Sequence, residues 1–485
     1  MSKKIFLFSL VLTCASLAKA QNIFSIEEII SRAKEQSIFS KQAETQRETS
    51  YWQYRSFRTN YNPQLRLGGN VPTYSNSVRA VNQPDGSLVY LPLNQINPNV
   101  NVGLQQPIAL TGGNISANTG YNFFNNISTN ATQWSGTVLN VRLSQPVFGY
   151  NPWKWDKRIK PIVFEESKRI YVERTEQISS NAVSFFFDVL VQQVNQQIAT
   201  FNLANNDTIN KIEQGRYNIG TTSQDKLLQV QLQLLRSRQE VAQARLDLES
   251  ARLQLRSYIG LRDGDSFQLV LPDKIPPFEV TVEEALKYAR MNRADYIGFE
   301  RRRLEAESEV AQAKGQRYQT TISASYGLNN VGPTVSDLYS NPTKQQIADV
   351  SFNVPIVDWG RRRASMQTAY ANKKLRDYVI EQDKITFEQE IITKVNQFEM
   401  LRLQIEITKK SDEVAQERYN VAQNRYLIGK IDITNLNIAL REKDDAKRSY
   451  LQALKSFWTS YYDLRRLTLY DFANKSLLYV PDGED

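Results

Sequence analysis

The sequence of 485 residues contains no histidine and only one cysteine, Cys14. Without imidazole, the Ser-His and Cys-His nucleophile systems and the most frequent general base are excluded. Without a second cysteine, disulfides and thiolate metal sites are excluded as well. The carboxylates form no recognisable catalytic pair. We therefore expect a protein that is not an enzyme, with no catalytic residue, no cofactor and no metal site.

Long apolar runs are also missing. Beyond the first 20 residues no stretch reaches the roughly 18 apolar residues of a membrane-spanning helix. A transmembrane β-barrel remains compatible with this sequence, because its alternating pattern is hidden in an average of hydropathy. The net charge of +9 is diffuse, and the basic stretches also contain acids. We therefore expect no nucleic-acid partner.

The N-terminus has the pattern of a secretory signal peptide. Lys3 and Lys4 precede an apolar run over residues 5–12, and residues 18–20 read Ala-Lys-Ala. This pattern predicts cleavage before Gln21 and export of the chain. An uncleaved membrane anchor and lipidation of Cys14 are alternatives. The run is short for an anchor, and Thr13 is a poor residue before a lipidated cysteine.

Three sequence blocks occur twice, in the same order. Residues 216–220 recur at 425–429 and residues 143–147 at 352–356, both at an offset of 209. Residues 25–28 recur at 281–284, at an offset of 256, so the first copy holds about 47 additional residues. We predict a signal peptide over 1–20, a first repeat over 21–270, a second repeat over 271–470 and a tail over 471–485. Each repeat begins with a capping box, at Ser25 or Thr281.

Each copy contains a pattern of very long helices. After Gly220, leucine or valine and small residues recur every seven positions, as in a coiled coil. The second copy keeps the small column, but Lys443 interrupts its large column and is expected to weaken the seam. Helices are predicted over 154–258 and 361–467, broken only near Gly220 and Gly429. Each copy is thus an antiparallel helical hairpin that needs partner helices, with a rod-like coiled-coil dimer as the alternative.

Before each hairpin the apolar period changes from 3.6 to 2, which predicts β-hairpins over about 61–148 and 319–357. The additional residues of the first copy contain two more alternating stretches, at 99–108 and 114–123. Residues 73–97 are interpreted as a long polar loop. The first copy thus contributes two hairpins, or one hairpin and an external flap. A sheet in lipid must close with copies of itself, because open edges leave backbone groups unpaired.

Tryptophans follow the strands closely. Trp153, Trp155 and Trp359 lie where the aromatic residues of a membrane interface are expected. Ordinary packing at a junction between strand and helix is the alternative.

The signal peptide, the paired Pro146 and Pro355 at strand ends, and the paired Arg-Tyr-x-Ile-Gly turns before Leu-rich helices resemble the TolC outer-membrane efflux family. The resemblance covers about residues 22–470 and implies an α+β fold. The resemblance implies that coiled-coil hairpins form a periplasmic tunnel and that β-hairpins contribute to a shared transmembrane barrel in the cell outer membrane. It also implies a homotrimer in contact with outer-membrane lipid. Such a passive exit duct, for efflux or type I-like secretion, acts with a periplasmic adaptor protein and an inner-membrane transporter.

In the family that this chain resembles, the turns between helices form the periplasmic tip, where the tunnel narrows. The resemblance makes eight residues candidates for this aperture: Tyr217, Gly220, Asp225, Lys226, Tyr426, Gly429, Ile431 and Asn435. A family acid commonly falls six residues after the glycine, but this chain has Lys226 and Asn435 there. The sequence therefore leaves open whether ion pairs or an acidic ring close this aperture, and exposed polar turn residues without such a role are the alternative.

Two other protein classes share part of these features. A periplasmic adaptor of the membrane-fusion type also contains a coiled-coil hairpin, but a single one between halves of a lipoyl-like domain. A structural coiled-coil protein of the periplasm would have no barrel. Two hairpins and a duplication favour the exit duct.

Overall fold

The computed structural model describes residues 22–261, 267–272, 275–316 and 319–480. The predicted signal peptide and Cys14 lie outside the described residues. The chain divides into two compact units, and each takes segments from both sequence copies. The first, called the helical unit, comprises Met1–Arg47, Ser167–Tyr296 and Lys384–Asp485. The second, called the sheet unit, comprises Glu48–Glu166 and Ile297–Asp383.

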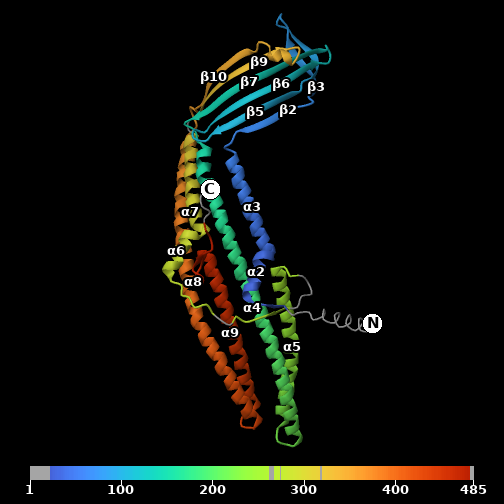
Figure 1. Ribbon diagram of the computed structural model, residues 1–485, viewed down its shortest axis with the longest axis vertical. Helices are drawn as coiled ribbons and strands as arrows, with labels where there is room; N and C mark the ends of the chain where they lie inside the picture. The colour runs from blue at the N-terminus through green and yellow to red at the C-terminus, as the bar shows by residue number, and fades with distance from the viewer. Residues whose placement is uncertain (1–21, 262–266, 273–274, 317–318, 481–485) are drawn as a thin grey trace, which may run out of the picture. The chain divides into compact units, whose positions relative to one another are not determined.

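Two helical hairpins make up most of the helical unit (Figure 1). The first consists of α4 (Pro152–Asn218) and α5 (Gln224–Ile259), and the second of α8 (Arg361–Leu427) and α9 (Ile433–Thr468). Corresponding helices have equal lengths, 67 residues for α4 and α8 and 36 for α5 and α9. The heptad leucines of α5 are buried: Leu227, Leu234, Leu248 and Leu255.

Shorter helices precede each hairpin. They are α2 (Ile26–Gln36) and α6 (Val282–Asn292), each followed by a 22-residue helix, α3 (Ile38–Thr59) or α7 (Ala294–Gly315). The capping box predicted at Ser25 is confirmed. The Ser25 hydroxyl accepts from the Glu28 backbone N–H, and the Glu28 carboxylate accepts from the Ser25 N–H at 2.9 Å. Both orphan donors of the first turn are satisfied in this way.

The core of the helical unit is aromatic and contains a buried ion network. Phe186, Phe187, Phe398 and Phe457 are fully buried. Glu176 accepts from Lys34 at 2.9 Å and from Arg465 at 2.8 Å, and Arg465 also donates to Asp471 at 2.5 Å. Two small sheets flank this core, a parallel pair of β1 (Asn22–Phe24) with β8 (Phe267–Leu269) and an antiparallel pair of β11 (Tyr470–Asp471) with β12 (Ser476–Leu477).

The sheet unit contains one large antiparallel sheet. Its main strands run side by side in the order β2-β5-β6-β7-β9-β10 (Figure 1). Their bounds are β2 (Gln64–Asn70), β5 (Asn99–Ile108), β6 (Gly113–Asn126), β7 (Ala131–Val147), β9 (Gln319–Gly332) and β10 (Thr343–Asn353). The strands predicted at 99–108 and 114–123 are confirmed as β5 and β6.

The prediction of a polar loop over residues 73–97 is wrong. This segment forms a hairpin of β3 (Tyr74–Asn82) and β4 (Leu88–Ile96). It joins the main sheet only where Gln95 and Ile96 pair with β6. The Ser and Asn residues of this segment led to the prediction of a loop. Gly86 takes the positive φ of 84° that a tight turn requires. A short turn between two extended segments permits the hairpin despite their polarity.

The register of the main sheet separates an apolar face from a polar face, because paired residues lie on the same side. The apolar face contains exposed large side chains from all six strands: Leu65, Leu67, Val100, Leu104, Ile115, Leu139, Val141, Leu143, Ile322, Tyr326 and Val350. The opposite face is rich in asparagine and serine: Asn70, Asn99, Asn101, Ser116, Asn118, Asn140, Ser144, Ser323, Ser325 and Asn329.

Within the described part of the chain, no helix is both long and apolar enough to span a membrane.

Candidate functional site at the hairpin turns

The two hairpins end in turns of the same construction. Gly220 and Gly429 have φ values of 78° and 74°, so each occupies the left-handed region. The next residue's N–H reaches back across the turn, from Thr221 to the Arg216 carbonyl at 2.9 Å and from Lys430 to the Arg425 carbonyl at 2.8 Å. These bonds satisfy carbonyls at the end of the helix, which is the usual reason for a glycine after a helix terminus.

A side-chain contact, here called the latch, joins the two hairpins near these turns. The Tyr426 hydroxyl of α8 donates to the Glu213 carboxylate of α4 at 2.7 Å. Arg216 donates to the same carboxylate oxygen at 2.7 Å and to the Leu427 carbonyl at 3.4 Å. Its guanidinium carbon also lies 5.4 Å from the centre of the Tyr426 ring. The latch thus combines a charge-assisted hydrogen bond with a cation–π contact.

Tyr426 and Glu213 of the latch are shielded from water, and Arg216 is half-buried. Tyr426 is 2% exposed and packs in a cluster with the following residues: Ile209, Val230, Tyr419, Ile433, Leu436 and Leu440. Burial alone would raise the pKa of Glu213, but the hydrogen bonds from Tyr426, Arg216 and Thr222 outweigh it and lower the pKa. Burial and the bond to Glu213 raise the pKa of Tyr426 above its ordinary value of 10.0. The charged acid and the neutral phenol are therefore the stable pair at neutral pH.

The two predicted tyrosines lie in different surroundings. Tyr426 is part of the latch, whereas Tyr217 is 40% exposed. The residue at the position of Glu213 in the second copy is Ala422, whose side chain cannot accept a hydrogen bond. Of the two turn tyrosines, only Tyr426 thus takes part in the latch.

The remaining predicted aperture residues lie around the starts of α5 and α9. Asp225 and Lys226 are exposed on the first turn of α5, which Ser223 caps. Asn435 is exposed and bonds to the cap residue Asp432 through both its backbone and its side chain, at 2.9 Å each. Ile431 packs against the buried cluster. No acid stands at the Lys226 and Asn435 positions, and the acids nearest to them are Asp225 and Asp432.

Lys443 was expected to weaken the coiled-coil seam, and the structure gives it a different environment. Its ammonium nitrogen lies 4.7 Å from the Phe201 ring and 4.6 Å from the Tyr419 ring, and 3.3 Å from the Asp444 carboxylate. The two rings and the carboxylate replace water around a side chain that is only 7% exposed.

The surroundings of Lys443 form a second contact between the hairpins, and neighbouring polar groups add hydrogen bonds to it. Asn202 donates to Asp444 at 2.7 Å, and Asn205 donates to the Tyr419 hydroxyl at 3.0 Å. Burial, followed by the charge of Asp444, raises the pKa of Tyr419 to about 12. Two buried polar contacts therefore connect the hairpins, the latch near the turns and the Lys443 contact further along the helices.

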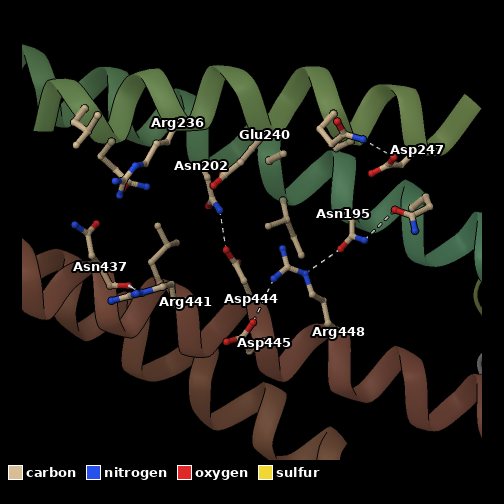
Figure 2. Close-up of a pocket in the computed structure, with 18 of the residues that line it drawn as sticks. Asn195, Asn202, Arg236, Glu240, Asp247, Asn437, Arg441, Asp444, Asp445 and Arg448 are labelled. Atoms are coloured by element: carbon tan, nitrogen blue, oxygen red, sulfur yellow. Dashed lines mark hydrogen bonds and ion pairs between the residues drawn. The ribbon is translucent and has the colours of Figure 1, made fainter.

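A polar groove of about 650 Å³ lies beside the second contact, between α4, α5 and α9. Figure 2 shows Arg448 of α9 bonded to Asn195 of α4 and to Asp445, while Asn202 bonds to Asp444. Other charged residues line the groove: Arg236, Glu240, Asp247 and Arg441. Both charge signs are present, so the lining of the groove is polar rather than apolar.

The predicted interface tryptophans lie where strands of the sheet unit end. The Trp153 carbonyl accepts from the Tyr61 hydroxyl at 3.0 Å, and the two rings are 5.4 Å apart. The guanidinium carbon of Arg158 lies 5.1 Å from the Trp155 ring. Trp359 is 96% exposed.

Sequence reasoning missed Glu213 and Arg216 as site residues. A signal was available, because an acid and an arginine three positions apart share a helix face. Comparing the copies would have shown that only the first has an acid there. The contact with Tyr426, 213 residues away in the sequence, depends on tertiary packing that the spacing alone does not predict.

A model of the outer membrane efflux protein family matches residues 29–261 and 282–468, most of the chain. The chain belongs to the outer membrane efflux protein family. This membership confirms the predicted resemblance and the outer-membrane location, and it supports an exit duct for efflux rather than a periplasmic adaptor. No curated protein matches the sequence.

Solved outer-membrane channels share the fold of this family member. The Campylobacter jejuni CmeC channel is 16% identical, with a TM-score of 0.66 over 91% of this chain and 85% of that chain. VceC from Vibrio cholerae is 13% identical, with a TM-score of 0.64 over 91% and 95%. The Neisseria gonorrhoeae MtrE channel in its open state is 15% identical, with a TM-score of 0.61 over 91% and 88%. The predicted fold class, coiled-coil hairpins with β-hairpins of a TolC-like channel, is confirmed.

Proposed function

We propose that three copies of this chain form a passive duct, whose joined sheets cross the outer membrane and whose helical hairpins line a periplasmic tunnel. The observation that carries the proposal is the large antiparallel sheet with an exposed apolar face and a polar face. An apolar face of this size needs a non-aqueous partner, and lipid is that partner in an outer-membrane protein. The asparagine-rich face then surrounds the water-filled passage.

The edges of the sheet support closure with other copies. Among the described strands, β2 pairs only with β5 and β10 only with β9, so both edge strands have an open side. Because the six main strands alternate in direction, β2 and β10 run in opposite directions. The β10 edge of one copy can therefore pair with the β2 edge of the next as an antiparallel neighbour.

Closure of three such sheets gives a barrel of eighteen strands, six from each copy. Barrels of about 16 to 18 strands enclose an aqueous channel. The β3–β4 hairpin is not counted, because only two of its residues, Gln95 and Ile96, pair in register with a main strand. In this barrel β5 and β6, the additional strands of the first copy, are part of the wall.

Cargo enters at the hairpin turns in this proposal. The latch holds the two hairpins of one copy together, and its release would let them separate and widen the entrance. A periplasmic adaptor, itself helical, would dock in the polar groove between the hairpins, and an inner-membrane transporter would supply the energy. The chain itself then contributes a passage for efflux or for type I-like secretion and performs no reaction.

Fractionation and planar bilayers test the proposal. The full chain should be recovered in the outer membrane, with a gel mobility that changes on heating, and the purified protein should conduct ions. Recovery as a soluble periplasmic species, or bilayers that stay closed even after the latch is removed by Tyr426→Phe, would contradict the proposed duct.

A further inference from the structure

The edge of the main sheet nearest the helices is rich in basic residues. The strand ends Gln64, Val147, Gln319 and Asn353 mark this edge, because the register brings them into neighbouring positions. The segments that adjoin it, residues 50–63, 148–161, 310–316 and 354–363, contain ten basic residues and two acids, Asp156 and Asp358. The ten, called the basic collar, are Arg55, Arg58, Lys154, Lys157, Arg158, Lys160, Lys314, Arg361, Arg362 and Arg363.

The collar is accessible in the sheet unit. Nine of its ten residues are exposed, and Arg362 is half-buried beside Asp358, with 3.6 Å between the charged atoms. The opposite edge of the sheet differs. Residues 71–98, 127–133 and 329–344 contain two basic residues, Arg79 and Lys344, and two acids, Asp85 and Asp337. The positive charge is therefore specific to the edge that adjoins the helices.

Exposed apolar side chains are interleaved with the collar. Phe148 is 81% exposed, Ile356 98% and Trp359 96%. Trp359 also has a positive φ of 51°, and it is followed by Gly360 at 85°. A water-filled passage gives no reason for such exposure. Lipid does, because amphipathic aromatics and long basic side chains are both stable where acyl chains meet headgroups.

We propose that the basic collar binds anionic phospholipid headgroups, such as phosphatidylglycerol, in the membrane leaflet that faces the helices. Arginine and lysine near a membrane surface attract anionic lipid, and the effect is about fivefold in partitioning for each residue. The collar provides ten such residues in each copy, next to apolar anchors. The inference rests on the membrane position of the sheet given by the proposed function.

Tryptophan fluorescence measures this contact directly. The wild-type protein is reconstituted in vesicles of phosphatidylcholine and phosphatidylglycerol, with brominated acyl chains on one lipid at a time. Bromine quenches nearby indoles, and Trp153, Trp155 and Trp359 lie within the collar. We expect the relative affinity for phosphatidylglycerol to exceed that for phosphatidylcholine by about tenfold or more at low salt, and to decrease at about 1 M salt through screening.

The variant R361Q/R362Q/R363Q removes three collar charges, and K409Q/K410Q/R418Q is the matched control. The control residues are exposed basic residues of the same helix, α8, within the helical unit. We expect the collar variant to lose at least about fivefold in preference for phosphatidylglycerol, and the control to keep the wild-type value. An unchanged preference in the collar variant overturns the inference.

The outcomes also separate the inference from the proposed function. Quenching by neither brominated lipid means that the sheet lies outside the membrane, which contradicts both. Equal quenching by the two lipids overturns only the lipid inference. Failure of the collar variant alone to assemble in lipid-free detergent identifies the collar as a contact between copies, which also overturns it.

Discussion

At the scale of single residues, the latch is the feature with the clearest chemistry. Tyr426 and Glu213 are buried together, Arg216 is half-buried beside them, and the three depend on one another for hydrogen bonding. Removing one partner of a buried charged group leaves that group unsatisfied, at a cost of about 1–3 kcal/mol. Changes of one atom should therefore have measurable effects at this site.

Tyr426→Phe removes only the hydroxyl that donates to Glu213. We expect the contact between the hairpins to weaken by about 1–3 kcal/mol, because a buried carboxylate loses a donor. If the latch closes the entrance, the conductance in planar bilayers should increase. Tyr217→Phe is the matched control, since Tyr217 is exposed and outside the latch. Equal conductance in both variants would show that the latch does not restrict the passage.

The latch should also respond to pH in a defined direction. The pKa of Glu213 is lowered in the folded chain from 4.5, so its stabilising contribution is present above pH 4.5 and is lost as the pH falls through the lower folded value. The pKa of Tyr426 is raised, so its contribution is present below pH 10.0 and is lost as the pH rises toward the folded value. The free energy of unfolding, measured against pH, should therefore decrease at the acidic end (the acid limb) and again at the alkaline end (the alkaline limb).

Glu213→Gln provides the control for this dependence. The amide still accepts from Tyr426 but does not titrate, so the acid limb should flatten while the alkaline limb remains. An acid limb that is identical in the variant would assign the titration to other carboxylates.

At the scale of the elements, the turns of the hairpins depend on backbone conformation. An added Cβ at Gly220 or Gly429 meets no atom within 4 Å, so only the positive φ opposes a side chain. Gly429→Ala should therefore destabilise the chain by about 1–2 kcal/mol. Gly215→Ala is the matched control, because Gly215 lies inside α4, also in open space, and alanine should stabilise the helix by about 0.5–1 kcal/mol.

Chemical unfolding of the two glycine variants measures the expected destabilisation by Gly429→Ala and the expected stabilisation by Gly215→Ala in one experiment. A stabilising effect of Gly429→Ala, or a destabilising effect of Gly215→Ala of equal size, would contradict the assigned turn conformation.

The buried Lys443 contact joins the hairpins at a second position, further along the helices than the latch. Lys443→Met removes the cation and leaves Asp444 with the single bond from Asn202, so we expect destabilisation of about 3 kcal/mol. The double variant with Asp444→Asn should recover part of this loss, because the uncompensated charge is removed as well. A double-mutant cycle in chemical denaturant measures the coupling. Additive effects would show that the two charges do not interact.

The sequence predicts the helices well because their signals are local. Heptads, the caps at Ser25 and Thr281, and the glycines after each long helix all lie within a few residues of the feature they mark. The β3–β4 hairpin was missed, because its Ser and Asn content resembles a loop. The surroundings of Lys443 were missed for another reason: the Phe201 and Tyr419 rings come from two other helices and are distant in sequence.

At the scale of the whole molecule, the proposed duct depends on other copies of the chain. Each copy has an exposed apolar face, two open sheet edges and helices that need neighbours. Closure of a sheet in lipid pairs all its edges, which removes the cost of unpaired backbone groups. The sequence indicated this need for partners from periodicity alone. It left the strand count open, and six main strands for each copy now favour eighteen over twelve.

Electron cryomicroscopy of the purified full chain in lipid nanodiscs tests the central claim most directly. We expect three copies around one axis and a closed barrel of eighteen strands, with the β10 edge of each copy paired to the β2 edge of the next. We also expect the hairpin turns of the three copies to gather at the end of a helical tunnel. A barrel of twelve strands would contradict the strand assignment, and a monomer or an unclosed sheet would contradict the duct itself.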